Sequence, residues 1–219
     1  MTDAGELLPD RYRAVVFDMD GLLLDTELLW QRAETELFAR RGVKFSWDDK
    51  MTVIGSSFAF TGSYFAQRLG VPEAEGPRLV AEMVELMHGH LREQVAGRPG
   101  AVELVERLRG HTRLGLASNS PRALVDTALA TARIGDAFDA IVTSDDVEHP
   151  KPAPDLYLLA CARLGVDPAE ALALEDSPSG VAAAKAAGLT CIAVPQFAET
   201  DVSAADRIID SLEDLLAET

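Results

Sequence analysis

Arg13-Ala-Val-Val-Phe-Asp-Met-Asp-Gly21 is the stretch that decides the fold. Residues 14–17 form a compact apolar run, typical of a buried strand, and acids and a glycine turn follow it. Asp18 and Asp20 therefore come at the carboxyl end of a strand, where open α/β sheets bind their ligands. Their spacing of two places both acids on the same side of the turn. Such carboxylates repel each other unless a cation lies between them or one stays protonated.

The same apolar pattern recurs along the second half of the chain, with helical stretches between the recurrences. The expected strands are residues 13–18, 114–117, 140–142, 171–174, 191–194 and 207–209, and the expected helices are residues 101–109, 121–131, 152–164, 179–187 and 212–217. Strands that alternate with helices of this length indicate parallel βαβ units. We therefore predict an α/β fold with a doubly wound parallel sheet and helices on both faces.

The segment from Glu27 to Ala96 interrupts this alternation. Apolar residues recur in it at helical spacing, as at Leu79, Met83 and Leu86, and no convincing strand is present. The turn-rich stretch at residues 97–100 then returns the chain to the sheet. We expect an α/β core domain from residues 1–26 and 97–219, with a helical domain of residues 27–96 inserted after the first strand.

Composition and charge exclude several classes of protein. No apolar run approaches the roughly 20 residues that a membrane helix needs. A formal net charge of −16 argues against nucleic acid as a partner, because that binding depends on Lys and Arg. The same charge repels anionic substrates, so a site for one needs a bound cation and a Lys or Arg within a Debye length of roughly 8–10 Å.

The cysteines and the N-terminus favour an intracellular protein. Cys161 and Cys191 cannot make a disulfide framework or a four-ligand zinc site, so we expect buried thiols. Residues 1–13 contain acids and a proline where a secretory signal needs a basic region and an apolar stretch, so the expected location is the cytoplasm.

Asp18 and Asp20 suit phosphoryl transfer. An ionised aspartate can attack phosphorus and form an acyl phosphate, while a neighbouring acid protonates the leaving oxygen and then deprotonates the attacking water. Taken alone, the motif is equally compatible with a plain turn in which the acids cap the local backbone.

Small polar residues follow a later strand. Ser118 and Asn119 come just before a helix, where hydroxyl and backbone N–H donors can hold phosphate oxygens. The alternative is a plain N-cap by Ser120 with Pro121 at the first helical position, and both roles can coexist.

A lysine and a second acid pair follow two further strands. Lys151 lies between prolines, and this rigid presentation suits a charge-neutralising lysine, although a single surface lysine is usually solvated. Glu175 and Asp176 offer hard oxygens suited to Mg²⁺, and helix capping is their alternative role.

In this order, the four motifs resemble the haloacid dehalogenase superfamily over nearly the whole chain, from Phe17 to Leu216. The resemblance implies an Mg²⁺-dependent enzyme in which Asp18 is the nucleophile and a metal ligand. It implies that Asp20 is the general acid/base and that the Asp20 carbonyl is a metal ligand. It also implies that Ser118 and Asn119 bind the phosphoryl group, that Lys151 offsets its negative charge, and that Glu175 and Asp176 bind the metal. The helical insertion would match the family's small cap, which closes over the site.

Details within the superfamily narrow the implied reaction. True dehalogenases and phosphonatases lack the second acid, so Asp20 argues against both. The β-phosphoglucomutase branch shares the region of residues 25–27, but Trp30 stands where those mutases have a histidine, and serine follows Gly55 where they typically have arginine. Without a cation in the cap for a second phosphate, water is the expected acceptor.

The stretch of residues 21–30 looks most like that of sugar and polyol phosphatases. The expected partner is a small phosphorylated metabolite, with no nucleic acid and no membrane, bound by a monomer or weak homo-oligomer. A β-phosphoglucomutase-like phosphotransferase and a non-catalytic binding protein are the alternatives, and the retained acids and lysine argue against the latter.

Aromatic residues of the insertion are candidates for a lid over the leaving group, or are ordinary core. They are Trp30, Phe58, Phe60, Tyr64 and Phe65. Arg122 either reaches the phosphate or is a solvated surface charge.

Overall fold

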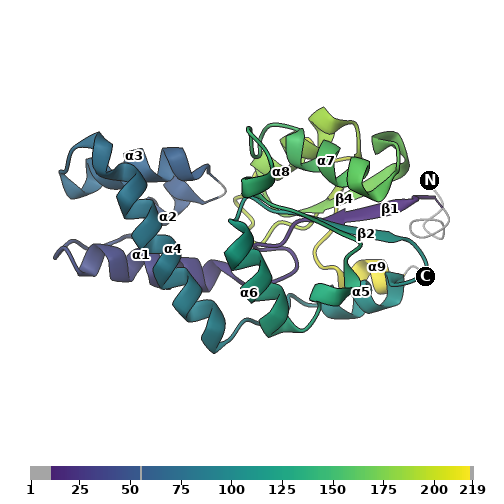
Figure 1. The fold of residues 1–219 in the computed structure, drawn as a ribbon, viewed down its shortest axis with the longest axis horizontal. Coiled ribbons are helices and arrows are strands. Elements are labelled where there is room, and N and C mark those ends of the chain that lie inside the picture. Colours follow the sequence, from purple (N-terminus) through teal and green to yellow (C-terminus); the bar gives the residue numbers. More distant parts are fainter. Residues whose placement is uncertain (1–10, 55, 218–219) are drawn as a thin grey trace.

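The computed structural model describes residues 11–54 and 56–217 (Figure 1). Residues 1–10, Gly55 and residues 218–219 lie outside the described residues. Most of the N-terminal stretch that was searched for an export signal is therefore not described. The strands are β1 (Ala14–Phe17), β2 (Arg113–Ala117), β3 (Ala140–Val142), β4 (Ala171–Glu175), β5 (Thr190–Ala193) and β6 (Arg207–Ile208). The α-helices are α1 (Glu27–Ala39), α2 (Trp47–Val53), α3 (Phe58–Leu69), α4 (Gly76–Glu93), α5 (Ala101–Leu108), α6 (Arg122–Ala132), α7 (Asp155–Leu164), α8 (Pro178–Ala187) and α9 (Glu213–Ala217).

The six strands form one parallel sheet in the order β3-β2-β1-β4-β5-β6. At its centre, Val16 pairs with Gly115 of β2 and with Ala173 of β4. The prediction of a doubly wound parallel sheet is confirmed. No strand begins or ends more than one residue from its predicted bounds. The helix expected from residue 152 starts at Asp155 instead, with Pro154 at its N-cap position, and a proline disfavours a helical conformation of the residue before it.

Alternating side chains of β1 face two separate apolar cores. Val15 and Phe17 pack in the cluster that contains the buried faces of α5, α6 and α9. Ala14 and Val16 pack in the cluster formed with α7 and α8. Because both faces of the sheet are covered, its strands are apolar throughout, as parallel strands usually are.

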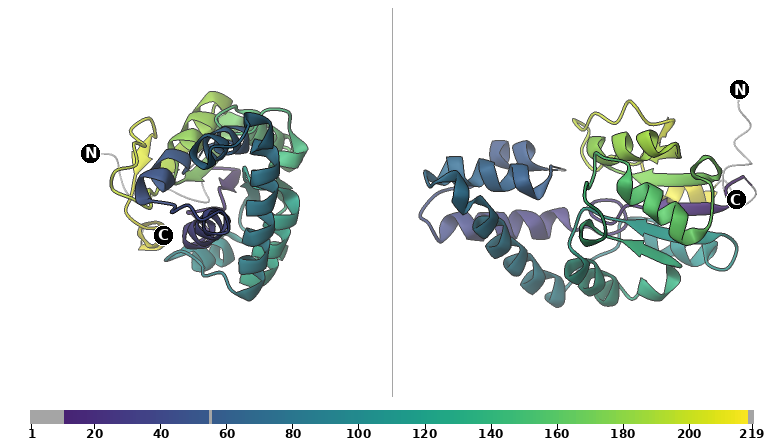
Figure 2. Two further views of the ribbon diagram at one scale, coloured as in Figure 1. Left: turned by 90° about the vertical axis from the view of Figure 1, so that its left-hand side faces the viewer. Right: turned by 45° about the horizontal axis from the view of Figure 1, so that its top comes forward.

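The helical insertion, meaning α1 to α4, lies beyond the carboxyl ends of the strands, and the views in Figures 1 and 2 agree on this. The chain enters and leaves it through adjacent segments, since Leu24 bridges to Gly97 and the Arg98 N–H donates to the Leu23 carbonyl at 2.9 Å. A second contact joins α4 to α6 of the core, where His88 Nε2 lies 2.8 Å from Thr127 Oγ1.

Within residues 11–54 and 56–217, no helix has the length and apolar character needed to cross a membrane.

Candidate active site

Asp18 lies immediately after β1, at the carboxyl edge of the sheet. Its backbone N–H donates to the Leu174 carbonyl of β4 at 3.0 Å, and its side chain is only 10% exposed. The turn that follows depends on Gly21, whose φ of +85° favours glycine. A Cβ at this position would also overlap the Asp176 carboxylate. The glycine therefore lets the ends of β1 and β4 approach each other.

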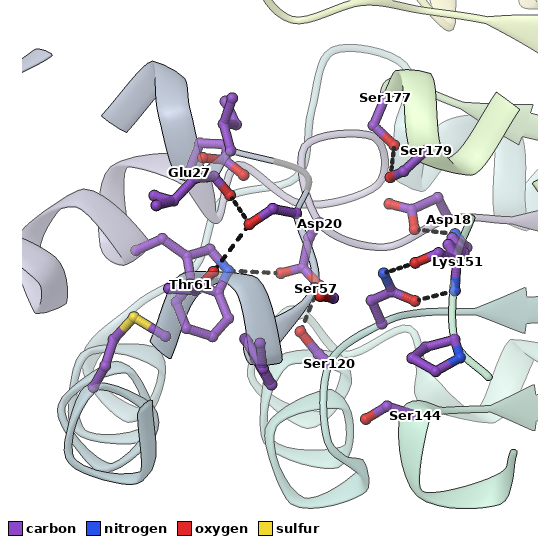
Figure 3. Close-up of a pocket in the computed structure, with 18 of the residues that line it drawn as sticks. Asp18, Asp20, Glu27, Ser57, Thr61, Ser120, Ser144, Lys151, Ser177 and Ser179 are labelled. Carbon is purple, nitrogen blue, oxygen red and sulfur yellow. Dashed lines mark hydrogen bonds and ion pairs between the residues drawn. The ribbon is translucent and has the colours of Figure 1, made fainter. Parts of the chain in front are cut away.

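Lys151 neutralises Asp18 from the loop before α7 (Figure 3). Its Nζ lies 2.6 Å from Asp18 Oδ1 and 2.6 Å from Glu175 Oε1, and the side chain is 2% exposed. Although burial lowers it, these two carboxylates raise the pKa of Lys151 above its usual value. The ammonium group thus stays charged beside the Asp18 carboxylate. Asn119 holds this loop, because its Oδ1 accepts from the Lys151 N–H at 2.8 Å.

Glu175 is fully buried, and both of its carboxylate oxygens are already engaged. Oε1 accepts from Lys151 Nζ at 2.6 Å and from the Tyr157 hydroxyl at 2.7 Å. Oε2 accepts from the N–H groups of Asp176 and Ser177, at 3.1 and 3.3 Å, and from Ser177 Oγ at 3.2 Å. These contacts hold the Glu175 carboxylate in place, and the carboxylate in turn positions the Lys151 ammonium group.

Asp18, Glu175 and Asp176 gather carboxylate oxygens within 4.8 Å of one another. Burial raises the pKa of both Asp18 and Asp176 well above the usual range, and repulsion from the neighbouring carboxylates raises it further. A divalent cation would relieve this repulsion, and carboxylate oxygens are ligands that Mg²⁺ prefers. The residues therefore fit a hard cation. Glu175 would have to exchange one of its present hydrogen bonds to ligate it, whereas no hydrogen bond occupies the Asp176 carboxylate among those described.

Asp20 is held apart from this cluster by four donors. Thr26 Oγ1 and Trp30 Nε1 donate to its Oδ1 at 2.8 and 3.1 Å. Ser118 Oγ and Ser120 Oγ donate to its Oδ2 at 3.2 and 2.8 Å. Three of the donors belong to the core and Trp30 belongs to the first helix of the insertion, so the position of the Asp20 carboxylate depends on both.

The expected phosphate-binding residues lie next to the two aspartates. Ser118 is fully buried, and Asn119 lines the pocket described below. Ser120 does not cap α6, since Pro121 occupies the N-cap position without a side-chain hydrogen bond. Arg122 is exposed and pairs with Asp126 of the same helix at 2.8 Å, so it is a surface charge.

A pocket of about 450 Å³ lies between the strand ends and the helical insertion. This volume is within the range of small-molecule sites. Of the aromatic lid candidates, Trp30 and Phe58 line the pocket. The other three do not: Phe65 is fully buried in the core, the Tyr64 hydroxyl donates to Asp49 at 2.6 Å, and Phe60 is 49% exposed.

The insertion also contributes an ion triad, formed by Glu27 and Glu34 of α1 and Lys50 of α2, which sequence reasoning missed. Lys50 Nζ lies 2.8 Å from Glu27 Oε2 and 3.2 Å from Glu34 Oε2. The insertion therefore does place a cation in the pocket wall, but Lys50 is already paired with two carboxylates. The spacing of Glu27, Trp30 and Glu34, which puts them on one face of a helix, was a usable signal. No local pattern marks Lys50.

The sheet and the acid–lysine cluster at its edge define an α/β enzyme site suited to phosphate chemistry. The family model of haloacid dehalogenase-like hydrolases matches residues 12–188. Hexitol phosphatase B of Escherichia coli (strain K12) is 35% identical over 193 residues, covering 85% of this chain and 85% of that protein. Protein CbbY of Cereibacter sphaeroides is 36% identical over 223 residues, covering 92% of this chain and 93% of that protein.

Solved structures agree with these relatives. The crystal structure of a CbbY variant from Rhodobacter sphaeroides in complex with xylulose-(1,5)-bisphosphate matches with a TM-score of 0.77 and 32% identity, covering 94% of this chain and 98% of that one. The chain belongs to the haloacid dehalogenase-like hydrolases. As the sequence predicted, it is an enzyme of the phosphatase type.

Proposed function

We propose that this chain is a Mg²⁺-dependent phosphatase that hydrolyses a small sugar or polyol phosphate through an aspartyl phosphate on Asp18. The observation that carries the proposal is the buried contact of 2.6 Å between Lys151 Nζ and Asp18 Oδ1 at the pocket floor. The contact leaves the other Asp18 oxygen, Oδ2, to attack phosphorus. The hexitol phosphatase among the relatives supports the substrate class.

Two steps account for hydrolysis. In the first, an Asp18 oxygen attacks phosphorus, the bond from phosphorus to the substrate oxygen breaks, and Asp20 gives a proton to that oxygen. In the second, Asp20 takes a proton from water, whose oxygen attacks the same phosphorus. The acyl phosphate bond then breaks, which frees phosphate and restores the Asp18 carboxylate. Lys151 offsets the negative charge in both steps, and Ser118 and Asn119 hold the phosphoryl oxygens.

Asp18, the Asp20 carbonyl and Asp176 would hold the Mg²⁺ ion, with Glu175 as a further candidate. When bound, the ion supplies positive charge that stabilises the phosphoryl oxygens and draws an anionic substrate into an acidic protein. An anionic substrate needs this added positive charge, because the five acids of the described pocket lining outnumber its two lysines.

We further propose that residues 27–96 act as a cap that covers the pocket and limits the access of water, since all four insertion helices contribute to the pocket lining. We expect the enzyme to work in the cytoplasm on a free metabolite, as a monomer or weak homo-oligomer.

The test is a phosphate-release screen over phosphorylated sugars, polyols, nucleotides and small acids, with and without Mg²⁺. Asp18→Asn should lose turnover and remain folded, and Asp126→Asn, which alters an exposed acid of α6, should retain wild-type turnover. Beryllium fluoride should be trapped against Asp18 in a crystal structure. Turnover by Asp18→Asn would refute the proposal. Conversion of a sugar 1-phosphate to its 6-phosphate, without release of phosphate, would instead identify a phosphotransferase.

A further inference from the structure

The ion triad places three charged side chains in the wall of the pocket that the insertion forms. Lys50 and Glu34 are 3% and 4% exposed, and Glu27 is only slightly more accessible. Figure 3 shows Glu27 across the pocket from Asp18 and Lys151. Buried ion pairs contribute little net stability compared with well-packed apolar residues. The triad therefore calls for an explanation other than stability of the helical bundle.

Two carboxylate oxygens of the triad are incompletely satisfied. Glu27 Oε2 and Glu34 Oε2 are buried next to Lys50, yet neither makes a hydrogen bond of acceptable geometry. Buried polar atoms normally have such a partner. Both side chains line the pocket, so their carboxylate groups can turn toward a bound molecule and accept hydrogen bonds from it.

The charges of the pocket disfavour a second phosphate group. Among the described lining residues, Lys50 and Lys151 are the positively charged ones. Lys151 is engaged by Asp18 and Glu175, and Lys50 by the two acids of the triad. A phosphate near the triad would meet two carboxylates for one ammonium group.

The remaining pocket wall suits a hydroxylated carbon chain. Trp30 and Phe58, whose ring centroids lie 5.9 Å apart, provide an apolar surface for C–H groups. Ser57 and Thr61 add hydroxyl groups from α3 and the residue before it. The wall thus combines acceptors for hydroxyl groups with a surface for the carbons that bear them.

We infer that the ion triad selects a neutral, hydroxyl-bearing leaving group, that of a polyol or sugar monophosphate, and rejects substrates with a second phosphate. Glu27 and Glu34 accept hydrogen bonds from substrate hydroxyl groups, and Lys50 holds the two carboxylates together. This inference deepens the proposed function and rests on it.

The test compares three substrates with the full-length enzyme in Mg²⁺. A hexitol 6-phosphate has the proposed leaving group, the corresponding hexitol 1,6-bisphosphate adds a second phosphate, and phenyl phosphate has no hydroxyl groups and reports the core chemistry alone. Wild-type kcat/KM should be at least about tenfold higher for the hexitol 6-phosphate than for either of the others, which is the size of effect expected from hydrogen bonds to charged groups.

Glu27→Gln and Glu34→Gln should each raise KM for the hexitol 6-phosphate about tenfold. Both should lower kcat/KM for phenyl phosphate much less than for the hexitol 6-phosphate, and circular dichroism should show that the variants are folded. Glu36→Gln is the matched control, because Glu36 lies on the same helix with a 43% exposed side chain that pairs with Arg40. This control should leave KM and kcat/KM unchanged for both substrates.

Two results would overturn the inference. One is an unchanged KM for the hexitol 6-phosphate in both glutamine variants. The other is a preference for the bisphosphate that disappears in Lys50→Met, which would make Lys50 a phosphate ligand.

The failure of the proposed function would look different, because the wild type would then release phosphate from none of the three substrates. In that case, calorimetric binding of the hexitol 6-phosphate and the bisphosphate to Asp18→Asn in Mg²⁺ decides the inference. Equal affinities, or tighter binding of the bisphosphate, would refute it.

Discussion

Gly180→Ala tests whether the hydrogen-bonded position of Glu175 controls the active site. Gly180 is buried near the start of α8, and a Cβ there would overlap the Glu175 carboxylate. The carboxylate group cannot move away freely, because it is fully buried and accepts the five hydrogen bonds described above. Its displacement would also move Lys151 away from Asp18.

The expected magnitude follows from three opposing effects. Alanine favours a helix over glycine by about 1 kcal/mol. Overpacking a tight site costs about 1–3 kcal/mol, and each lost hydrogen bond to a charged group costs about 1.5–3 kcal/mol. If one hydrogen bond is lost, the free energy of unfolding should fall by about 1.5–5 kcal/mol. We expect kcat to fall by at least about tenfold, because charge relief at the phosphoryl group weakens.

Urea denaturation measures the stability and phosphate release measures kcat. The control is Gly89→Ala on α4, since an added Cβ there meets nothing within 4 Å. It should be neutral or stabilising by up to about 1 kcal/mol and should keep wild-type kcat. If Gly180→Ala behaves like this control, Glu175 is not held as the structure indicates.

Three further outcomes are expected. Lys151→Met should abolish turnover and lower the free energy of unfolding by about 3–5 kcal/mol, because it leaves buried carboxylates unpaired; Lys185→Met removes a more exposed ion pair and should cost less than about 1 kcal/mol in the same denaturation assay. Burial raises the pKa of Glu34 from 4.5 to about 7, because the folded protein favours the protonated carboxyl group. The resulting stabilisation of the folded state is fully present below pH 4.5 and is lost as the pH rises to about 7. Unfolding measured at several pH values should therefore show Glu34→Gln gaining on wild type by on the order of 3 kcal/mol between these limits, and parallel pH profiles would contradict the assigned burial. Trp30→Phe keeps an aromatic ring but removes the donor to Asp20, so kcat should fall several-fold to about tenfold, and an unchanged kcat would show that this hydrogen bond is dispensable.

The sheet and the order of the site residues were predictable because both follow from local patterns. Each strand is a short apolar run, and the carboxyl ends of parallel strands meet at one edge, so Asp18, Lys151 and Asp176 were expected at the same edge of the sheet. Their detailed roles at that edge were not predictable to the same degree.

Contacts between distant segments escaped prediction. Tyr157 reaches Glu175 from another element, and Ser120 donates to Asp20, although its position before a helix was equally typical of an N-cap. Lys50 looks like any exposed lysine in the sequence, and only the packing of α2 against α1 buries it between two acids. Such contacts depend on tertiary packing, which no local spacing encodes.

The chain passes into and out of the helical insertion at two neighbouring points, where Leu24 bridges to Gly97. Because the ends of the insertion meet there, its length and internal fold are not constrained by the strand order of the sheet. Evolution or a protein engineer can therefore exchange the whole helical unit for another at this junction while Asp18, Lys151 and Asp176 stay in place at the edge of the sheet. The exchange would also replace Thr26 and Trp30 if the cut were made before them, so a functional chimera needs a junction that preserves the donors to Asp20.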